Sequence, residues 1–337
     1  MHPARLVALA ALLVAGPLAA QESVPVRAAP VPVFAEQSPE QTVFGELRFL
    51  GGVQLESTDK RFGGLSGIEI SGDGRAALFV SDQGDLFSAT LDYDNGVLSG
   101  LSGVTVSHLI DTDGTPLTDK YSSDAESLRA ANGKGLNGNG PTGDVVIGFE
   151  RDNRAISYRL DANGCAVKAT SLALPEAVKT LPFNQGLEGI AVIPQGAPNA
   201  GAIVAFGESE MESNPGVIPG WLIAGGKTRD LGLTRTSGFD LTDIVALPDG
   251  DMIVLERHFS MFLGVAMRIR RLSAAELDGP QPMRGTTLLT AGMAHAVDNM
   301  EGVAVHHDGT GRTILTIVSD DNFSALQRTL ILQFELL

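Results

Sequence analysis

A motif of about six residues recurs five times along this chain at a nearly constant spacing. Successive copies lie 60, 62, 55 and 58 residues apart. Their equivalent residues are Ser66, Glu126, Glu188, Asp243 and Glu301. Typical copies read GLSGIE at 64–69 and GLEGIA at 186–191. A fixed period of this size predicts repeated supersecondary units rather than one wound sheet. If the units form a circle, the four acidic members converge.

Each copy is followed by a turn and a second apolar run. In the first unit, Gly67–Ile70 leads through the SGDG sequence at 71–74 to Ala76–Val80. The fourth and fifth units repeat this pattern with Asp-Gly pairs at 249–250 and 308–309. An Asp-Gly pair between two β-rich runs predicts a β-hairpin. Several short antiparallel strands in each repeat are typical of a β-propeller blade. A solenoid or an elongated sandwich is the alternative.

We therefore predict an all-β propeller that is closed by strands from both ends of the chain. Val43–Leu55 is rich in β-forming residues and would complete the last blade beside Thr329–Leu337. Five repeats are visible, which gives five blades. We favour six blades, with one blade diverged from the motif.

The N-terminus is typical of an exported protein. Positive charge within Met1–Arg5 precedes an apolar run at Leu6–Leu18 and two alanines. This is the order of a secretory signal peptide, predicted at residues 1–20. The run is shorter than the roughly 20 residues that span a bilayer, so we expect a soluble periplasmic or secreted protein without membrane insertion. Residues 21–42, rich in Pro, Ala and Val, are predicted to be an extended linker, and residues 43–337 a single propeller domain.

The charge and the cysteine content limit the classes of function and the sources of stability that this chain can have. The formal net charge is −16, which repels nucleic acid and is compatible with divalent cations. Cys165 is the only cysteine, so stability must come from packing or bound ions rather than an internal disulfide. We expect a monomer that acts on a small molecule and does not bind nucleic acid.

Propeller topology predicts two tiers of acidic residues at one mouth of the central channel. The two inner strands of a blade form a hairpin, so the start of the first and the end of the second lie on the same face. The first tier is Glu126, Glu188, Asp243 and Glu301. The second tier is Glu150, Glu208, Glu256 and Asp320, with Asp82 from the first unit.

Converging carboxylates suit a hard divalent cation, because Ca²⁺ and Mg²⁺ prefer oxygen ligands. Without a cation, like charges held close together raise one another's pKa values. We expect Ca²⁺, or otherwise Mg²⁺ or another divalent ion, at Glu126, Glu188, Asp243 and Glu301. The alternative is structural: acids at blade starts accept hydrogen bonds from loop N–H groups and tie blades together.

Two arginines occupy equivalent positions at the ends of second strands. Arg151 follows Glu150, and Arg257 follows Glu256. A guanidinium grips a phosphate or carboxylate through parallel hydrogen bonds, so both are candidates for substrate binding. His258, next to Arg257, is a candidate general acid or base. The alternative for each arginine is an ion pair with a neighbouring acid.

Taken together, these motifs resemble a family of exported bacterial proteins, the phytase-like domain described as "esterase-like activity of phytase". The resemblance spans about residues 45–337. Its matching segments are 63–68, 124–128, 184–189, 243–257 and 298–322. It implies a β-propeller, export and a phosphoric-ester hydrolase role based on the repeated acids. Better-known propeller phytases combine several Ca²⁺ ions with a Lys/Arg-rich phosphate site. This chain has no such lysine cluster, which favours a smaller phosphomonoester or phosphodiester over inositol hexaphosphate.

The leading hypothesis is a metal-assisted phosphoesterase acting on a small phosphorylated substrate. Its catalytic candidates are Glu208, Glu256 and His258. Its substrate-binding candidates are Arg151, Arg257, Glu150 and Asp320. Two alternatives stay open: a non-catalytic, Ca²⁺-stabilised propeller that binds a ligand or protein, and a lactonase-like or sugar-processing hydrolase with one central metal, because the fold alone does not select the chemistry.

Overall fold

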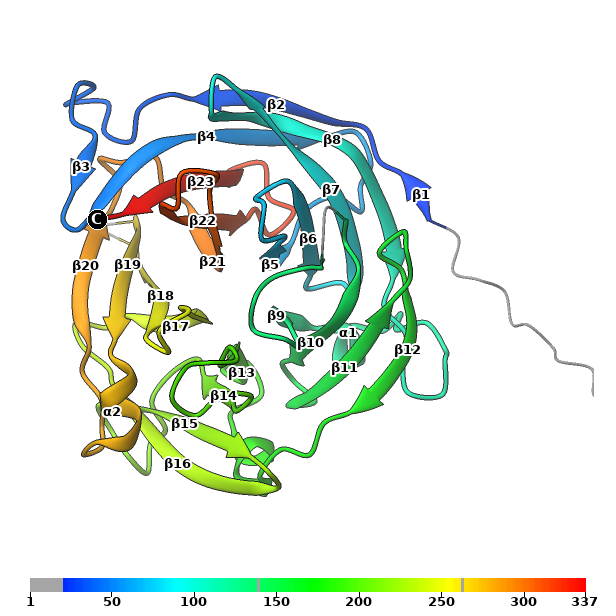
Figure 1. The fold of residues 1–337 in the computed structure, drawn as a ribbon, viewed down its shortest axis with the longest axis vertical. Coiled ribbons are helices and arrows are strands. Elements are labelled where there is room, and N and C mark those ends of the chain that lie inside the picture. The colour runs from blue at the N-terminus through cyan, green and yellow to red at the C-terminus, as the bar shows by residue number, and fades with distance from the viewer. Residues whose placement is uncertain (1–20, 138–139, 262–263) are drawn as a thin grey trace, which may run out of the picture.

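The computed structural model describes residues 21–137, 140–261 and 264–337. Its strands form five antiparallel sheets arranged as a five-bladed β-propeller (Figure 1). The predicted all-β class and propeller architecture are confirmed. The described residues form one sheet per repeat, so the preference for six blades is not confirmed. The predicted signal peptide lies outside the described residues.

Each blade begins with a strand at the centre of the molecule and continues outwards. The first blade consists of β5 (Leu65–Ile70), β6 (Ala76–Ser81), β7 (Asp85–Asp94), β8 (Val97–His108) and β1 (Glu22–Ser23). The second consists of β9 (Ala125–Ala130), β10 (Gly143–Phe149), β11 (Arg154–Leu160) and β12 (Ala166–Ser171). The third consists of β13 (Leu187–Val192), β14 (Ile203–Gly207), β15 (Val217–Ala224) and β16 (Lys227–Thr234).

The remaining two blades contain the C-terminal strands. The fourth blade consists of β17 (Asp240–Ala246), β18 (Met252–Ser260), β19 (Gly264–Leu272) and β20 (Thr286–Ala291). The fifth consists of β21 (Asn299–His307), β22 (Thr313–Asp320), β23 (Thr329–Leu336), β4 (Leu47–Ser57), β2 (Val26–Val31) and the short β3 (Val43–Phe44). Strands from both ends of the chain thus share the fifth blade, where Thr329 of β23 pairs with Leu55 of β4.

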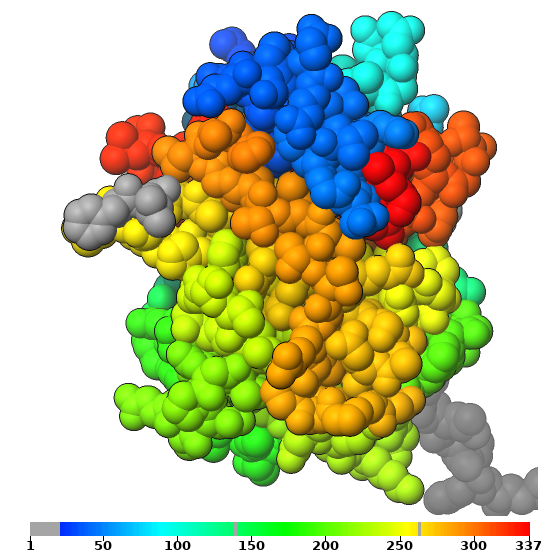
Figure 2. All heavy atoms as spheres, turned by 90° about the vertical axis from the view of Figure 1, so that its left-hand side faces the viewer, coloured from blue at the N-terminus to red at the C-terminus, as the bar shows by residue number. Residues whose placement is uncertain are grey.

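The segment expected to be a linker forms part of the folded domain. β1 pairs with β8, and β2 pairs with β4 along its whole length. The buried ring of Phe34 lies 5.0 Å from that of Phe44 and 5.1 Å from that of Phe334. Figure 2 shows the N-terminal residues (blue) packed against the segment that contains β20 (orange), where Glu46 N–H donates to Leu288 O at 3.0 Å. These N-terminal strands extend existing blades instead of forming a sixth.

Helices are few and short. Among the described residues they are α1 (Lys120–Ser123), α2 (Ala274–Asp278) and the 3₁₀ helix η1 (Glu176–Thr180). In the part of the chain that the structure describes, no helix is both long and apolar enough to cross a membrane. Glycines of the repeated motif let the inner strands approach closely. A Cβ on Gly189 would lie 3.0 Å from Ile244 Cγ2 of the fourth blade, and one on Gly302 would lie 3.1 Å from the backbone nitrogen of Ile68 in the first.

Candidate functional site

A polar pocket of about 250 Å³ lies at one mouth of the channel, and all five blades contribute to it. It is lined by Asp82, Lys120, Asp124, Glu126, Glu150, Arg151, Asn184, Glu188, Arg257, Asn299, Glu301, Asp320 and Asn322. Seven of the eleven predicted site residues are in this wall: Glu126, Glu150, Arg151, Glu188, Arg257, Glu301 and Asp320. We call it the acidic mouth.

A β-bulge in each innermost strand positions the repeated residue. The pairing register skips one residue at the same place in every blade. The skipped residues are Ser66, Glu126, Glu188, Thr242 and Glu301. A bulged residue leaves the regular alternation of the strand, which re-aims its side chain. Three of the five are glutamates that line the acidic mouth.

The other two bulged residues join neighbouring blades through their hydroxyl groups. Ser66 donates to Ala125 O, just before Glu126. Thr242 donates to Met300 O at 3.1 Å, just before Glu301. Both hydroxyls therefore hold a backbone carbonyl beside a pocket glutamate, and neither adds charge to the pocket.

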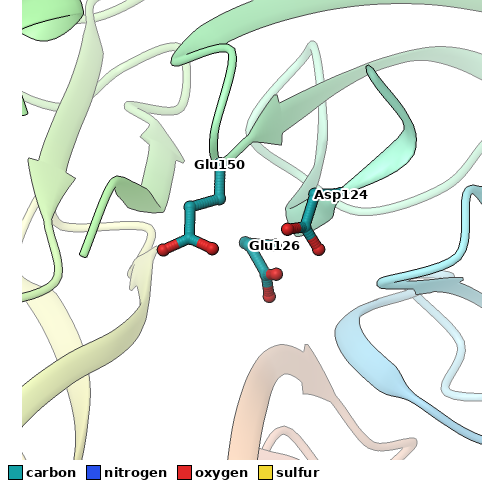
Figure 3. Close-up of side chains that lie close together, drawn as sticks. All are labelled: Asp124, Glu126 and Glu150. Atoms are coloured by element: carbon teal, nitrogen blue, oxygen red, sulfur yellow. The ribbon is translucent and has the colours of Figure 1, made fainter. Parts of the chain in front are cut away.

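Two groups of carboxylates lie close enough to share a cation. Asp124, Glu126 and Glu150 each have one carboxylate oxygen that lies within 4.8 Å of the corresponding oxygens of the other two residues. The same holds for Glu150, Glu188 and Glu208. Figure 3 shows the first group, with three carboxylates that face a common space. Glu150 belongs to both groups and accepts a hydrogen bond from Gly186 N at 3.1 Å.

Glu126 and Glu188 differ from their neighbours because neither carboxylate has a hydrogen-bond donor or ion-pair partner among the described residues. Burial raises the pKa of both well above the usual range, and nearby carboxylates raise it further. The strongest such neighbour is Glu188 for Glu126, and Glu208 for Glu188. This donor set consists of hard, unsatisfied oxygens, and it fits a divalent cation such as Ca²⁺.

Three cationic side chains surround these carboxylates. Arg257 bridges Glu208 at 3.2 Å and Glu301 at 3.1 Å. Lys120 forms ion pairs with Asp82 and Asp124, and Arg151 also pairs with Asp124. The alternative that the sequence offered for each arginine, an ion pair with a neighbouring acid, is thus what the structure shows for Arg151 and Arg257.

Burial leaves protons on two further acids of this region. It is the main cause that raises the pKa of Glu208 to about 8, against the opposing effect of Arg257. It also raises the pKa of Asp320 to about 8, and the neighbouring Glu301 raises it further. Both carboxyl groups therefore hold a proton at neutral pH when no cation is bound.

Comparison with known proteins agrees with this arrangement. The model of the phytase-like family, described as "Esterase-like activity of phytase", matches residues 60–323. The chain belongs to this family. No curated protein matches it. The family match spans the inner strands and loops that build the acidic mouth, and it supports a phosphoesterase-type propeller with small-molecule substrates.

One predicted metal ligand of this phytase-like propeller needs correction. Asp243 is fully buried and forms an ion pair with Arg129. It also accepts hydrogen bonds from Ile244 N and Val303 N, each at 2.8 Å. The equivalence between units that we drew from the sequence was wrong by one residue in the fourth blade. There Thr242, and not Asp243, is the bulged equivalent of Glu188. Asp243 instead occupies the position of Gly189, which faces the next blade.

None of the three predicted catalytic residues is part of the pocket wall. Glu208 lies just behind it, with an oxygen within 4.8 Å of oxygens of Glu150 and Glu188, and the other two lie elsewhere. Glu256 is fully buried and is held by Arg268 at 2.6 Å and by Arg270 at 2.8 Å. His258 Nδ1 lies 2.9 Å from Gly238 O, and its ring packs 5.5 Å from that of Phe239. Neither residue lines the acidic mouth, so their positions do not support a role in proton transfer there.

Sequence reasoning missed Lys120 and Asp124 as site residues. Asp124 opens the second copy of the motif, two residues before Glu126, so the motif itself contained a signal for it. Lys120 lies on α1, outside the repeats, and had no periodic signal. Its Nζ reaches Asp82 of the first blade at 2.7 Å, a contact that only the packing of the two blades creates.

Proposed function

We propose that this chain is an exported, metal-assisted phosphoric-ester hydrolase that acts on a small phosphomonoester or phosphodiester at the acidic mouth. The observation that carries the proposal is the pair Glu126 and Glu188. Both carboxylates lie in the pocket without a donor, and cationic side chains are close by. Burial and the neighbouring carboxylates disfavour the ionised form of both groups unless a cation lies beside them. A phosphate needs the same cation to enter an acidic pocket.

The cation would be held by Asp124, Glu126 and Glu150, or by Glu150, Glu188 and Glu208. Carboxylates alone favour Ca²⁺ or Mg²⁺ over metals that prefer nitrogen or sulfur, and we propose Ca²⁺. When bound, such an ion supplies Lewis acidity toward a phosphoryl oxygen.

The arginines would grip the phosphoryl group. Arg257 and Arg151 are both already paired with carboxylates, so a phosphate oxygen would take the place of one carboxylate oxygen on each guanidinium. The existing ion pairs hold each guanidinium in position before substrate arrives. Asp320 would donate its proton to the oxygen of the leaving group, since it carries a proton at neutral pH and lines the pocket.

Export is part of the proposal and rests on the sequence of residues 1–20. N-terminal sequencing of the protein from a periplasmic fraction tests it. A mature N-terminus near Gln21 is the expected result, and an uncleaved protein in the cytoplasm contradicts it.

The main experiment combines metal analysis with hydrolysis of p-nitrophenyl phosphate and bis(p-nitrophenyl) phosphate. We expect bound calcium and phosphate release that EDTA abolishes and Ca²⁺ restores. Glu126→Gln should lose both while staying folded. Asp144→Asn, which removes an exposed carboxylate 3.3 Å from Arg159 in the same blade, is the matched control. Bound calcium without turnover would instead favour the non-catalytic binding propeller, and opening of a lactone would favour the lactonase-like alternative.

A further inference from the structure

Exposed aromatic side chains gather around the acidic mouth. The structure describes four exposed aromatic residues: Tyr121, Phe183, Phe259 and Phe323. Three of them directly adjoin a residue of the pocket wall, since Tyr121 follows Lys120, Phe183 precedes Asn184 and Phe323 follows Asn322. Their exposed fractions are 53% for Tyr121, 52% for Phe183 and 45% for Phe323. We call these three residues the aromatic rim.

One side of the aromatic rim is joined to the pocket by a shared guanidinium. The rings of Tyr121 and Phe183 stack at a centroid distance of 6.2 Å and an interplanar angle of 26°. Arg151 lies over the Phe183 ring, 5.0 Å from its centroid, while its Nε pairs with Asp124. The phosphate-binding candidate Arg151 therefore contacts the polar pocket and the aromatic pair at the same time.

The other side is held by an unusual backbone. Asn322 and Phe323 are consecutive non-glycine residues in the left-handed region, with φ of 48° and 50°. This conformation is sparsely populated for such residues and persists only when surrounding contacts hold it. Here Asp320 accepts from Asn322 N at 2.7 Å, and Asp321 accepts from Phe323 N at 3.0 Å.

Glycine residues make room for the Phe323 ring. A Cβ on Gly64 would lie 2.7 Å from a ring carbon of Phe323, and Gly64 itself has a φ of +60°. Gly64 N donates to Asp321 at 3.1 Å, which fixes the loop that carries the ring. These contacts hold the exposed Phe323 ring in one position, and we therefore treat the ring as part of a binding surface.

We propose that the aromatic rim binds the planar apolar group of an aryl phosphoric ester whose phosphoryl group lies in the acidic mouth. This inference rests on the proposed function and adds a substrate class to it. Aromatic rings stack favourably on one another, and an alkyl or polyol group offers no such face. Because the rim adjoins the wall that carries Arg151, one small molecule can contact both. An aryl ester is therefore favoured over an alkyl ester of the same charge.

The test measures binding separately from turnover. Titration calorimetry with Ca²⁺ present compares phenylphosphonate with methylphosphonate, two ligands of the same charge that cannot be hydrolysed. We expect phenylphosphonate to bind about three- to tenfold more tightly. Tyr121→Ala and Phe323→Ala should each reduce this preference and leave methylphosphonate affinity within about twofold, since among the described residues no arginine lies over either ring. Phe259→Ala, at the exposed aromatic residue that neither lines the pocket nor directly adjoins a residue of its wall, should change neither.

Hydrolysis of phenyl phosphate, followed in the same variants, separates failure of this inference from failure of the proposed function. In Tyr121→Ala we expect KM to rise by the same factor as the loss of affinity, with kcat unchanged. Three results would overturn the inference, even if phenyl phosphate is hydrolysed. They are equal affinity for the two phosphonates, weak or absent binding of both, and an aryl preference that stays unchanged in the rim variants. A rim-dependent aryl preference without any hydrolysis supports the rim as a binding site and rejects the phosphoesterase.

Discussion

Two sets of acidic residues in this propeller have the same origin in the sequence pattern but opposite surroundings. In the acidic mouth, Glu126 and Glu188 have no donor among the described residues. In the interior, Asp243 is paired with Arg129, and Glu256 with Arg268 and Arg270. A buried carboxylate next to its own arginine has its counter-charge within the protein, whereas one without a donor takes up a proton or binds a cation. The comparison separates acids that hold the fold together from acids that are available for a ligand.

The Arg129–Asp243 pair shows how extensive the structural role can be. Arg129, on the innermost strand of the second blade, donates to Ile68 O of the first blade at 3.1 Å and to Ile244 O of the fourth at 2.9 Å. Asp243 of the fourth blade accepts from Val303 N of the fifth. This ion pair therefore links four of the five blades across the channel.

The largest expected effect on stability comes from breaking that pair. Asp243→Asn leaves the guanidinium of Arg129 buried without its counter-charge, and loss of one partner of a buried pair costs about 3–5 kcal/mol. Urea denaturation of the purified variant measures the free energy of unfolding. The exposed Asp144→Asn change should cost about 0.5 kcal/mol or less. A loss below about 1 kcal/mol for Asp243→Asn would remove the distinction between the two sets of acids.

Glu188→Gln should behave in the opposite way. Burial and the neighbouring Glu208 and Glu150 raise the pKa of Glu188, so its ionised form is disfavoured without a cation. A neutral amide at this position should therefore leave the metal-free variant at least as stable as the metal-free parent. Its Ca²⁺ affinity should fall by about tenfold or more, because a charged oxygen ligand is lost. Thermal denaturation with EDTA and with added Ca²⁺ measures both quantities. A variant that is destabilised without metal but still gains the full Ca²⁺ stabilisation would show that Glu188 is structural.

The metal-free protein should lose stability as the pH rises. Glu208 and Asp320 both have a folded-state pKa of about 8, above the ordinary pKa values of 4.5 and 3.8 that apply to the unfolded chain. Between these limits the folded state binds more protons than the unfolded state, so the free energy of unfolding falls from about pH 4 to pH 8. Denaturation of EDTA-treated protein across this range tests the sign.

Glu208→Gln provides the control for that pH profile. The amide does not titrate, so the variant should show a shallower decline than the parent protein. Saturating Ca²⁺ should also flatten the decline, because a bound cation favours the ionised carboxylates. The same slope in parent and variant would exclude Glu208 as a source of the pH dependence.

The smallest effect is expected for His258→Ala. The imidazole contacts Gly238 O and the Phe239 ring and does not line the acidic mouth. We expect phosphate release to change by less than about twofold, with a stability loss of about 1 kcal/mol. A loss of activity of a hundredfold or more, with an altered pH–rate profile, would restore the catalytic role that the sequence suggested.

The sequence by itself determined the repeated architecture and most of the wall of the candidate site. Hydrophobic runs, Asp-Gly turns and a period near 58 residues specify hairpin blades, because these signals act within one unit. The recurrence of an acid at one point of each unit was enough to gather Glu126, Glu188 and Glu301 at one mouth.

Tertiary structure alone decided the rest, because it depends on contacts between units. A bulge sets which of two adjacent residues leaves the strand, and a shift of one residue turns a side chain to the other face. That is why Thr242, and not Asp243, is the equivalent of Glu188. Packing between blades also decided which acids meet an arginine, and it placed the N-terminal strands on existing blades rather than in a sixth.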